Sequence, residues 1–180
     1  MGQRQRDQRD IPTMSGLLRN VLTLLLGLCC TRKAPSASLS TGFLITPLDV
    51  GIAKLKSDRY LRLTEAAQID FLARTGLFMT LMLRRYSFVN AAVLVRFAAP
   101  IKVFSWVEIQ SRVVYHDERF AYFEHRFMSQ EKQCACVLVK MKFKRARQTI
   151  TPRTLLGSAG HASRPDCLHD WDRLLAQPWS

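Results

Sequence analysis

The sequence contains none of the short motifs that identify the common nucleotide-dependent and serine-dependent enzymes. It has no Gly-x-Ser-x-Gly nucleophile elbow, no phosphate-binding loop and no dinucleotide-binding glycine fingerprint. The five cysteines do not describe a zinc site, because Cys134-x-Cys136 has no second Cys or His pair to complete it. Without a clean secretion signal they do not describe a disulfide framework either. We therefore expect no metal and no cofactor.

A membrane-spanning apolar run is also missing from the N-terminal region. Residues 21–30 are Leu-rich, but they fall far short of the ~20 apolar residues that cross a bilayer. Arg32 and Lys33 follow, where a signal peptide requires a neutral cleavage region. We predict a helix that lies on a membrane surface or docks on the folded domain. The expected location is cytoplasmic, peripheral to a membrane.

Acidic residues are scarce: 14 Asp and Glu stand against 27 Lys and Arg, which gives a net charge of +13. The basic residues are spread over the whole chain, and no RNA-binding or DNA-binding motif accompanies them. We expect no nucleic-acid partner. The charge indicates either a solvated basic surface or attraction of polyanions, such as coenzyme A phosphates, an acidic carrier protein or anionic lipid headgroups.

What the sequence does contain is a regular alternation of apolar and polar residues. Apolar residues at every second position predict four antiparallel strands within residues 89–97, 107–115, 121–127 and 135–143. In the first strand, Val89 shares a face with Val93 and Phe97, while Asn90 lies opposite. In the last, Cys134 and Cys136 fall on one face. Short connections predict hairpins at residues 100–102, 116–118 and 130–132. Each strand has one apolar face, and another element of the fold has to cover that face.

One helix, predicted from Arg59 to Thr75, can provide that cover. Its apolar half comprises Tyr60, Leu61, Thr64, Ala67, Gln68, Phe71 and Leu72. Asp70 and Arg74 lie on the polar half at the spacing of an i,i+4 ion pair. Ser57 is the predicted N-cap, and Gly76 is the predicted C-terminal stop.

The order of these elements resembles the hotdog fold, specifically the 4-hydroxybenzoyl-CoA-thioesterase-like group of acyl-CoA thioesterases. The residues that carry the resemblance are 47–51, 59–61, 65–67, 75–77, 95–100, 115–118 and 139–143. The resemblance implies an α+β fold in which an antiparallel sheet wraps around one long central helix. It divides the chain into a basic and apolar N-terminal extension with a linker (residues 1–40), a hotdog domain (41–157) and a C-terminal tail (158–180).

The same resemblance implies an acyl-CoA thioesterase that acts in fatty-acid metabolism. Carboxylate-activated water would hydrolyse an acyl thioester carried on coenzyme A or on a carrier protein. A homodimer or higher homo-oligomer is implied as well. The catalytic carboxylate would be Asp49, and the expected substrate-binding residues are Lys54, Lys56, Ser57, Asp58, Arg59 and Tyr60. Glu65 is a second carboxylate near the helix, and we expect it to serve as a structural hydrogen-bond partner.

The residues themselves leave two interpretations of Asp49 open. It can be a turn residue after Pro47 that binds backbone amides. Alternatively, it can act on a thioester carbonyl as general base or nucleophile. The free N–H groups and positive dipole of the helix start, near residues 57–60, would then hold the carbonyl oxygen.

One stretch departs from the family pattern. Many relatives carry His-x-Asn-Asn before the Arg-Tyr-Leu, whereas this chain has Lys54-Leu55-Lys56-Ser57-Asp58. This departure favours the alternative of a non-catalytic acyl-thioester-binding or membrane-associated hotdog protein. A third alternative, an acyl-thioester dehydratase, lacks its His-based acid/base pairing.

Overall fold

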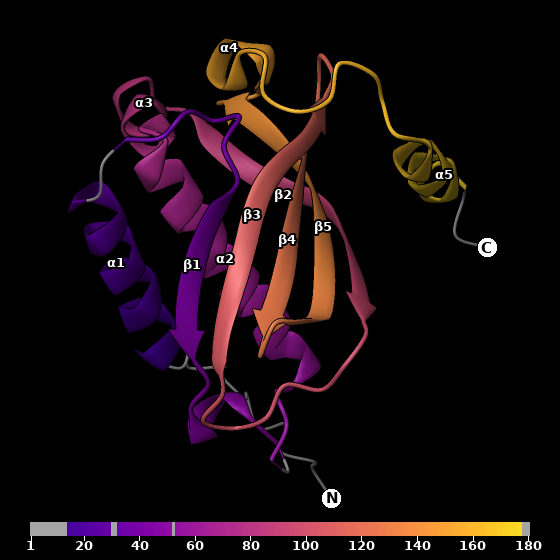
Figure 1. Cartoon of the computed structure of the whole chain (residues 1–180). Coiled ribbons are helices and arrows are strands. Elements are labelled where there is room, and N and C mark those ends of the chain that lie inside the picture. Colours follow the sequence, from indigo (N-terminus) through magenta and orange to yellow (C-terminus); the bar gives the residue numbers. More distant parts are fainter. Residues whose placement is uncertain (1–13, 30–31, 52, 178–180) are drawn as a thin grey trace, which may run out of the picture.

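A curled antiparallel sheet wraps around one long helix in the computed structural model (Figure 1). The structure describes residues 14–29, 32–51 and 53–177, so the expectations for residues 1–13 and 178–180 lie outside the described residues. The elements are α1 (Met14–Cys29), β1 (Leu39–Leu44), η1 (Pro47–Asp49), α2 (Ser57–Arg74), α3 (Leu77–Leu83), β2 (Ser87–Phe97), β3 (Trp106–His116), β4 (Ala121–Ser129), β5 (Lys132–Arg145), β6 (Gln148–Ile150), α4 (Arg153–Leu156) and α5 (Asp166–Leu175). The predicted α+β architecture is confirmed.

The strands follow the order β1-β3-β4-β5-β2, with β6 added to β5. All of these pairs are antiparallel. The hairpins predicted between β3 and β4 and between β4 and β5 are confirmed. The hairpin predicted at residues 100–102 is wrong, because β2 pairs with β5 and the chain then crosses to β3. Ile101, which is 2% exposed, anchors this crossing in the core. As a result β1 and β2 are edge strands at the two ends of this order.

A bulge in β2 makes the faces of that strand differ from the predicted ones. The register shifts between Asn90 and Ala92, so the residues before and after the shift are out of phase. Before it, Asn90 faces α2, and its side-chain amide donates a hydrogen bond of 3.3 Å to Gln68. After it, Val93 pairs with the buried Val139. Val89 and Val93 therefore do not share a face, and the placement of Asn90 opposite the helix was wrong.

A second register shift separates the two cysteines of β5. Phe127 pairs with Ala135 and Met128 with Gln133, which leaves Cys134 as the extra residue. Cys134 joins the core, whereas the Cys136 thiol lies on the outer face, 3.8 Å from Glu124. The prediction that both thiols share one face is wrong. Burial raises the pKa of both, so neither is an activated thiolate.

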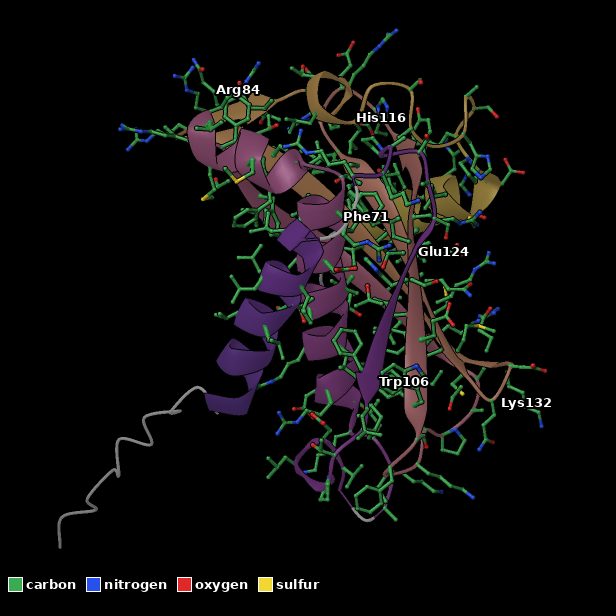
Figure 2. The ribbon with its side chains drawn as sticks, turned by 60° about the vertical axis from the view of Figure 1, so that its left-hand side comes forward. Phe71, Arg84, Trp106, His116, Glu124 and Lys132 are labelled. Atoms are coloured by element: carbon green, nitrogen blue, oxygen red, sulfur yellow. The ribbon has the colours of Figure 1, made fainter. Side chains whose placement is uncertain are left out.

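The central helix α2 covers the inner face of the sheet as predicted. Phe71 is 1% exposed and meets the Phe123 ring edge-on at 5.6 Å between their centroids; Figure 2 shows it between helix and sheet. The helix begins at Ser57, and Lys56 occupies the N-cap position that was predicted for Ser57. Gly76 ends it with a φ of 74°, where a side chain would be strained. Leu61, predicted in the apolar half, is 41% exposed.

Helix α1 covers the side of α2 that was predicted to face water. Gly27 allows this contact, because a Cβ there would lie 2.9 Å from the Cβ of Ala73. Asp70 is consequently buried, at 5% exposure. It accepts a hydrogen bond of 2.6 Å from the Thr41 hydroxyl and forms the predicted ion pair with Arg74 at 3.3 Å. Among the described residues, no helix is long and apolar enough to cross a membrane.

Helix α3 occupies a segment for which no helix was predicted. The run from Leu77 to Leu83 forms two turns of helix directly after Gly76. Leu77 and Leu81 are buried, at 6% and 2% exposure, while Leu83 is 80% exposed. A short helix therefore separates α2 from the strand β2.

The outer face of the sheet carries α5 (Figure 1). Leu168 and Trp171 pack there on Tyr122, and all three are at most 6% exposed. Asp172 accepts a hydrogen bond of 2.6 Å from the Tyr122 hydroxyl and one of 2.8 Å from Lys140. Burial raises the pKa of Asp172, but these two bonds, the charge of Lys140 and a further hydrogen bond from Arg164 together hold that pKa below its ordinary value.

Candidate active site at the start of the central helix

Asp49 occupies a short turn between β1 and α2. Pro47 opens this 3₁₀ turn, where its fixed φ and missing N–H fit the first position. The Oδ2 atom of Asp49 accepts hydrogen bonds from the Thr46 hydroxyl at 2.8 Å and from the Thr46 backbone N–H at 3.2 Å. The residue is 4% exposed. Asp49 is thus a buried carboxylate with a fixed orientation.

The loop after Asp49 folds back and brings this turn to the start of α2. Val50 and Leu55 form an isolated antiparallel bridge. The backbone N–H of Gly51 donates to the Lys54 carbonyl at 2.9 Å, and the N–H of Lys56 donates to the Asp49 carbonyl at 3.3 Å. The predicted proximity of Asp49 to the N-terminus of the helix is therefore present, and hydrogen bonds between backbone groups produce it.

The first turn of α2 keeps backbone donors available. Lys56 contributes no side-chain cap, and within the described residues the N–H groups of Ser57 and Asp58 have no hydrogen-bond partner. Both residues are exposed. A helix start leaves such N–H groups unpaired inside the helix and carries a partial positive charge. These two donors can therefore bind an oxygen atom that gains negative charge.

Arg59 brings a partly buried cation to the same turn. Its side chain is 13% exposed, and its Nε lies 3.6 Å from the Asp58 carboxylate, which is an ion-pair distance but not a hydrogen bond. Nε and Nη1 are both buried and have no hydrogen-bond partner in the described part of the chain. Buried polar atoms without partners are rare and call for an explanation such as water or a bound group. Arg59 can supply two donors to a ligand.

Tyr60, one of the predicted substrate-binding residues, lies in the core beside this turn. It is 3% exposed, and its ring packs against Phe97 at 4.9 Å and Phe127 at 5.2 Å between centroids. Burial raises the pKa of its hydroxyl, so that it stays protonated. Because Phe97 is 52% exposed on the edge strand β2, this aromatic group connects the start of α2 to the open edge of the sheet.

The remaining predicted site residues lie on the surface. Lys54 and Lys56 are exposed in the loop, and Lys54 forms a backbone bridge with Lys102 from the β2–β3 connection. Glu65 is exposed on α2 and makes no hydrogen bond within the described residues, so the structural role expected for it is not seen. The proximity of Lys102 was missed, since a contact between two loops leaves no periodic signal in the sequence.

A small cavity opens at this end of the sheet, beside the bridge between Lys54 and Lys102. It measures about 150 Å³ and is lined by Ile101, Lys102 and Cys134, among other residues. The residues described here include no group of His, Cys, Asp and Glu that could hold a metal ion. The arrangement is therefore a buried carboxylate, a helix start with free donors, and basic side chains around them. Such a set can polarise a carbonyl and activate water.

His125 lies outside this arrangement. It is fully buried in β4, and its Nδ1 is 2.9 Å from the Ser111 hydroxyl oxygen. Burial lowers the pKa of His125 to about 3, so the ring is neutral. His125 is therefore a residue of the core.

Comparisons with known proteins agree with the observed fold, and they also identify the family to which the chain belongs. A sequence profile described as thioesterase-like superfamily matches residues 52–156 of the chain. Protein THEM6 of Drosophila melanogaster is 31% identical over 115 residues, which cover 62% of this chain and 60% of that protein. The matched region thus spans less than two thirds of this relative.

Two solved structures show the same fold at low sequence identity. A probable thioesterase from Bartonella henselae superposes with a TM-score of 0.58 at 16% identity, covering 64% of this chain and 98% of its own. The protein SAV2348 from Staphylococcus aureus, solved in complex with CoA, superposes with a TM-score of 0.59 at 6% identity, covering 77% and 96%. At these identities the likeness concerns the fold alone.

Proposed function

Because the chain belongs to the thioesterase-like superfamily, we propose that it hydrolyses acyl-CoA thioesters and that Asp49 is its general base. The observation that carries the proposal is the pairing of a buried carboxylate with unpaired donors at the start of α2. A base and a set of oxyanion donors are the two components that acyl transfer to water requires.

In the proposed reaction Asp49 accepts a proton from water as the water oxygen attacks the thioester carbonyl carbon. The carbonyl oxygen becomes an oxyanion and is bound by the N–H groups of Ser57 and Asp58. When the tetrahedral intermediate collapses, the carbon–sulfur bond breaks and the thiolate of coenzyme A receives the proton. The products are a carboxylic acid and free coenzyme A.

Arg59 and the exposed lysines would bind the substrate. The unpaired Nε and Nη1 of Arg59 suit an oxygen of the substrate. Lys54 and Lys56 are exposed near the same turn, where they can attract coenzyme A phosphates through solvent.

The experiment is a hydrolysis panel. The purified full chain is incubated with acyl-CoAs of increasing length, and release of free thiol is followed. We expect hydrolysis above the spontaneous rate, and a fall in turnover of roughly 10²–10⁴-fold in Asp49→Asn, because this change removes the base and keeps the side-chain shape. The proposal fails if the variant retains full turnover.

A second candidate is a non-catalytic acyl-thioester-binding protein. Both hydrogen bonds from Thr46 to the Oδ2 of Asp49 lie within the turn, which suits a carboxylate that merely holds the loop. The departure at residues 54–58 favours the same candidate. Acyl-CoA binding without any hydrolysis, measured on the same purified chain, would select this function.

We also propose that β2 pairs with β2 of a second copy. It is an edge strand, so half of its backbone groups lack a partner strand. Val89, Val93, Leu94 and Phe97 are 45%, 40%, 45% and 52% exposed along it. Sedimentation should show a homodimer, and Leu94→Lys should shift it toward monomer. A monomeric wild-type chain at high concentration would contradict the pairing.

The outer face of α1 is proposed to contact a membrane surface. Val21, Leu22, Leu25, Leu26 and Leu28 are all exposed, between 42% and 60%. Such a run of exposed apolar side chains on one helix is typical of an interaction surface. Deletion of residues 1–33 should therefore reduce the membrane-bound fraction of the protein. An unchanged bound fraction would contradict this contact.

A further inference from the structure

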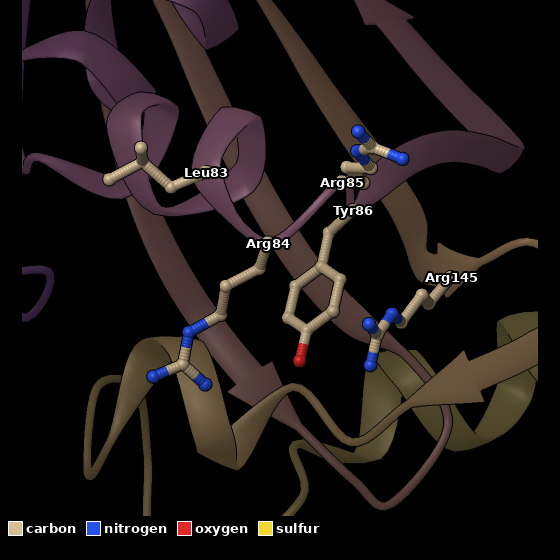
Figure 3. Close-up of a pocket in the computed structure, with 5 residues that line it drawn as sticks. All are labelled: Leu83, Arg84, Arg85, Tyr86 and Arg145. Atoms are coloured by element: carbon tan, nitrogen blue, oxygen red, sulfur yellow. The ribbon is translucent and has the colours of Figure 1, made fainter.

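Three arginines lie near one tyrosine at the opposite end of the sheet from Asp49. Arg84 and Arg85 follow α3, and Arg145 ends β5. Together with Leu83 and Tyr86 they line a pocket of about 500 Å³. Figure 3 shows the guanidinium groups of Arg84 and Arg145 flanking the Tyr86 ring. The residues that line this pocket include no carboxylate.

These arginines differ from the basic residues on the outer face of the sheet. Arg112 pairs with Glu124 at 2.6 Å, and Lys140 pairs with Asp172 at 2.8 Å. Within the described residues, Arg84 and Arg145 form no ion pair and no side-chain hydrogen bond. Cations that are gathered without a counter-charge repel one another and attract anions. The pocket therefore suits a phosphate-bearing partner.

Exposed apolar side chains lie directly beside these arginines. Leu83 is 80% exposed, and Met82 and Met79 are 55% and 41% exposed on the same short helix. In Figure 2, Arg84 lies at the tip of α3, which projects from the upper end of the molecule. An apolar tip next to unpaired arginines is complementary to the boundary between acyl chains and anionic headgroups.

The same side of the molecule also carries α1. Arg32 follows α1 and lies against the junction of α2 and α3, where a Cβ on Gly76 would be 3.2 Å from its Nε. The backbone N–H of Lys33 donates to the Arg74 carbonyl at 2.9 Å. Two further basic residues therefore lie near the junction of α2 and α3.

From this geometry we infer that α3 docks on an anionic phospholipid surface. Met82 and Leu83 enter the interfacial region, and Arg84 and Arg145 bind lipid phosphate groups. The inference extends the membrane contact proposed for α1 but rests on different residues, so each can fail without the other. It is also independent of thioester hydrolysis, which is measured on soluble substrate.

The test is co-sedimentation of the full chain with two kinds of vesicle, one of phosphatidylcholine alone and one of phosphatidylcholine mixed with anionic phosphatidylserine. Wild type should bind the anionic vesicles. Arg84→Gln/Arg145→Gln should bind about 30-fold more weakly, because each lost arginine contributes roughly a factor of five near a charged surface. The matched control, Arg119→Gln/Arg173→Gln, removes the same charge from exposed positions elsewhere.

A second pair of variants separates the apolar contribution. Leu83→Ser should weaken binding, while Leu174→Ser, at an equally apolar and 65% exposed position on α5, should not. Circular dichroism melting curves that match wild type establish that each variant is folded. Both comparisons keep α1 intact.

Three outcomes would overturn the inference. The first is absence of binding to anionic vesicles, and the second is an equal loss in the variants and their controls. In the third, inorganic phosphate binds the pocket at constant ionic strength, as judged by line shifts in NMR spectra, although vesicles do not bind. The pocket would then take a free phosphate compound, and α3 would have no role at a membrane.

Discussion

The charged side chains at the two ends of the sheet differ in their burial and in their partners. At the Asp49 end, the carboxylate is 4% exposed and oriented by hydrogen bonds from Thr46. At the Arg84 end, exposed arginines have no ion-pair partner in the described part of the chain and lie beside Leu83, which is 80% exposed. A buried and oriented group suits chemistry on one small molecule. Exposed and unpaired groups suit contact with an extended surface.

The two ends of the sheet share one hydrophobic core, and Phe71 lies within it. Phe71→Ala should lower the free energy of unfolding by about 3–5 kcal/mol, since it leaves a cavity between α2 and β4. Urea denaturation measures the change. Phe104→Ala, at a 69% exposed position, is the control and should alter stability little. A loss below about 1 kcal/mol at Phe71 would mean that the core is not built on α2.

His125 lies within that core and makes its stability depend on pH. Its pKa is about 3 in the folded chain because of burial, against roughly 6.5 when unfolded. The unfolded state therefore binds more protons between these values, and stability present above pH 6.5 is lost as the pH falls. Between pH 7.5 and 4.5 the wild type should lose about 2.5 kcal/mol more than His125→Gln. Equal losses in urea titrations of both proteins would show that His125 is already solvated.

Arg59 tests the difference between the two ends, because it is a cation at the Asp49 end whose Nε and Nη1 have no hydrogen-bond partner among the described residues. Arg59→Gln should weaken acyl-CoA binding about tenfold, the lower range for a hydrogen bond to a charged group. The dissociation constant is measured by calorimetry, with Arg173→Gln as the control at a 77% exposed position. An unchanged constant would assign the unpaired Nε and Nη1 to a structural water.

The smallest expected effect concerns the exposed lysines of the active-site loop. Lys54→Ala and Lys56→Ala should each weaken acyl-CoA binding a few-fold at low salt, and the difference from wild type should vanish near 1 M salt, where screening is nearly complete. Titrations at two salt concentrations measure this. A loss that persists at high salt would place these ammonium groups in direct contact with the ligand.

The strands and the central helix could be predicted because one periodic signal covers each of them. In β3 to β5 the alternating apolar residues are mostly the buried ones, and on α2 the predicted apolar stripe includes the buried Phe71. Helix α3 was missed because Leu77–Leu83 is a short apolar run, and periodicity alone does not distinguish such a run from a strand. The bulges at Asn90 and Cys134 were missed because one extra residue changes the face without changing the composition.

The candidate site was predictable only in part. The proximity of Asp49 to the start of α2 follows from chain order, and the structure adds the backbone bond from Lys56 that produces it. The burial of Tyr60 and the unpaired donors of Arg59 depend on contacts with distant strands and loops. The resemblance to a family placed both residues in the site, but it could not assign their separate roles.

The most direct test of the account is a single comparison of turnover on a soluble acyl-CoA, with no membrane present. Wild type, Asp49→Asn and Arg84→Gln/Arg145→Gln are assayed side by side under saturating substrate. The account predicts a loss of roughly 10²–10⁴-fold in Asp49→Asn alone, since only that end of the sheet carries the base. Wild-type turnover in Asp49→Asn would contradict it.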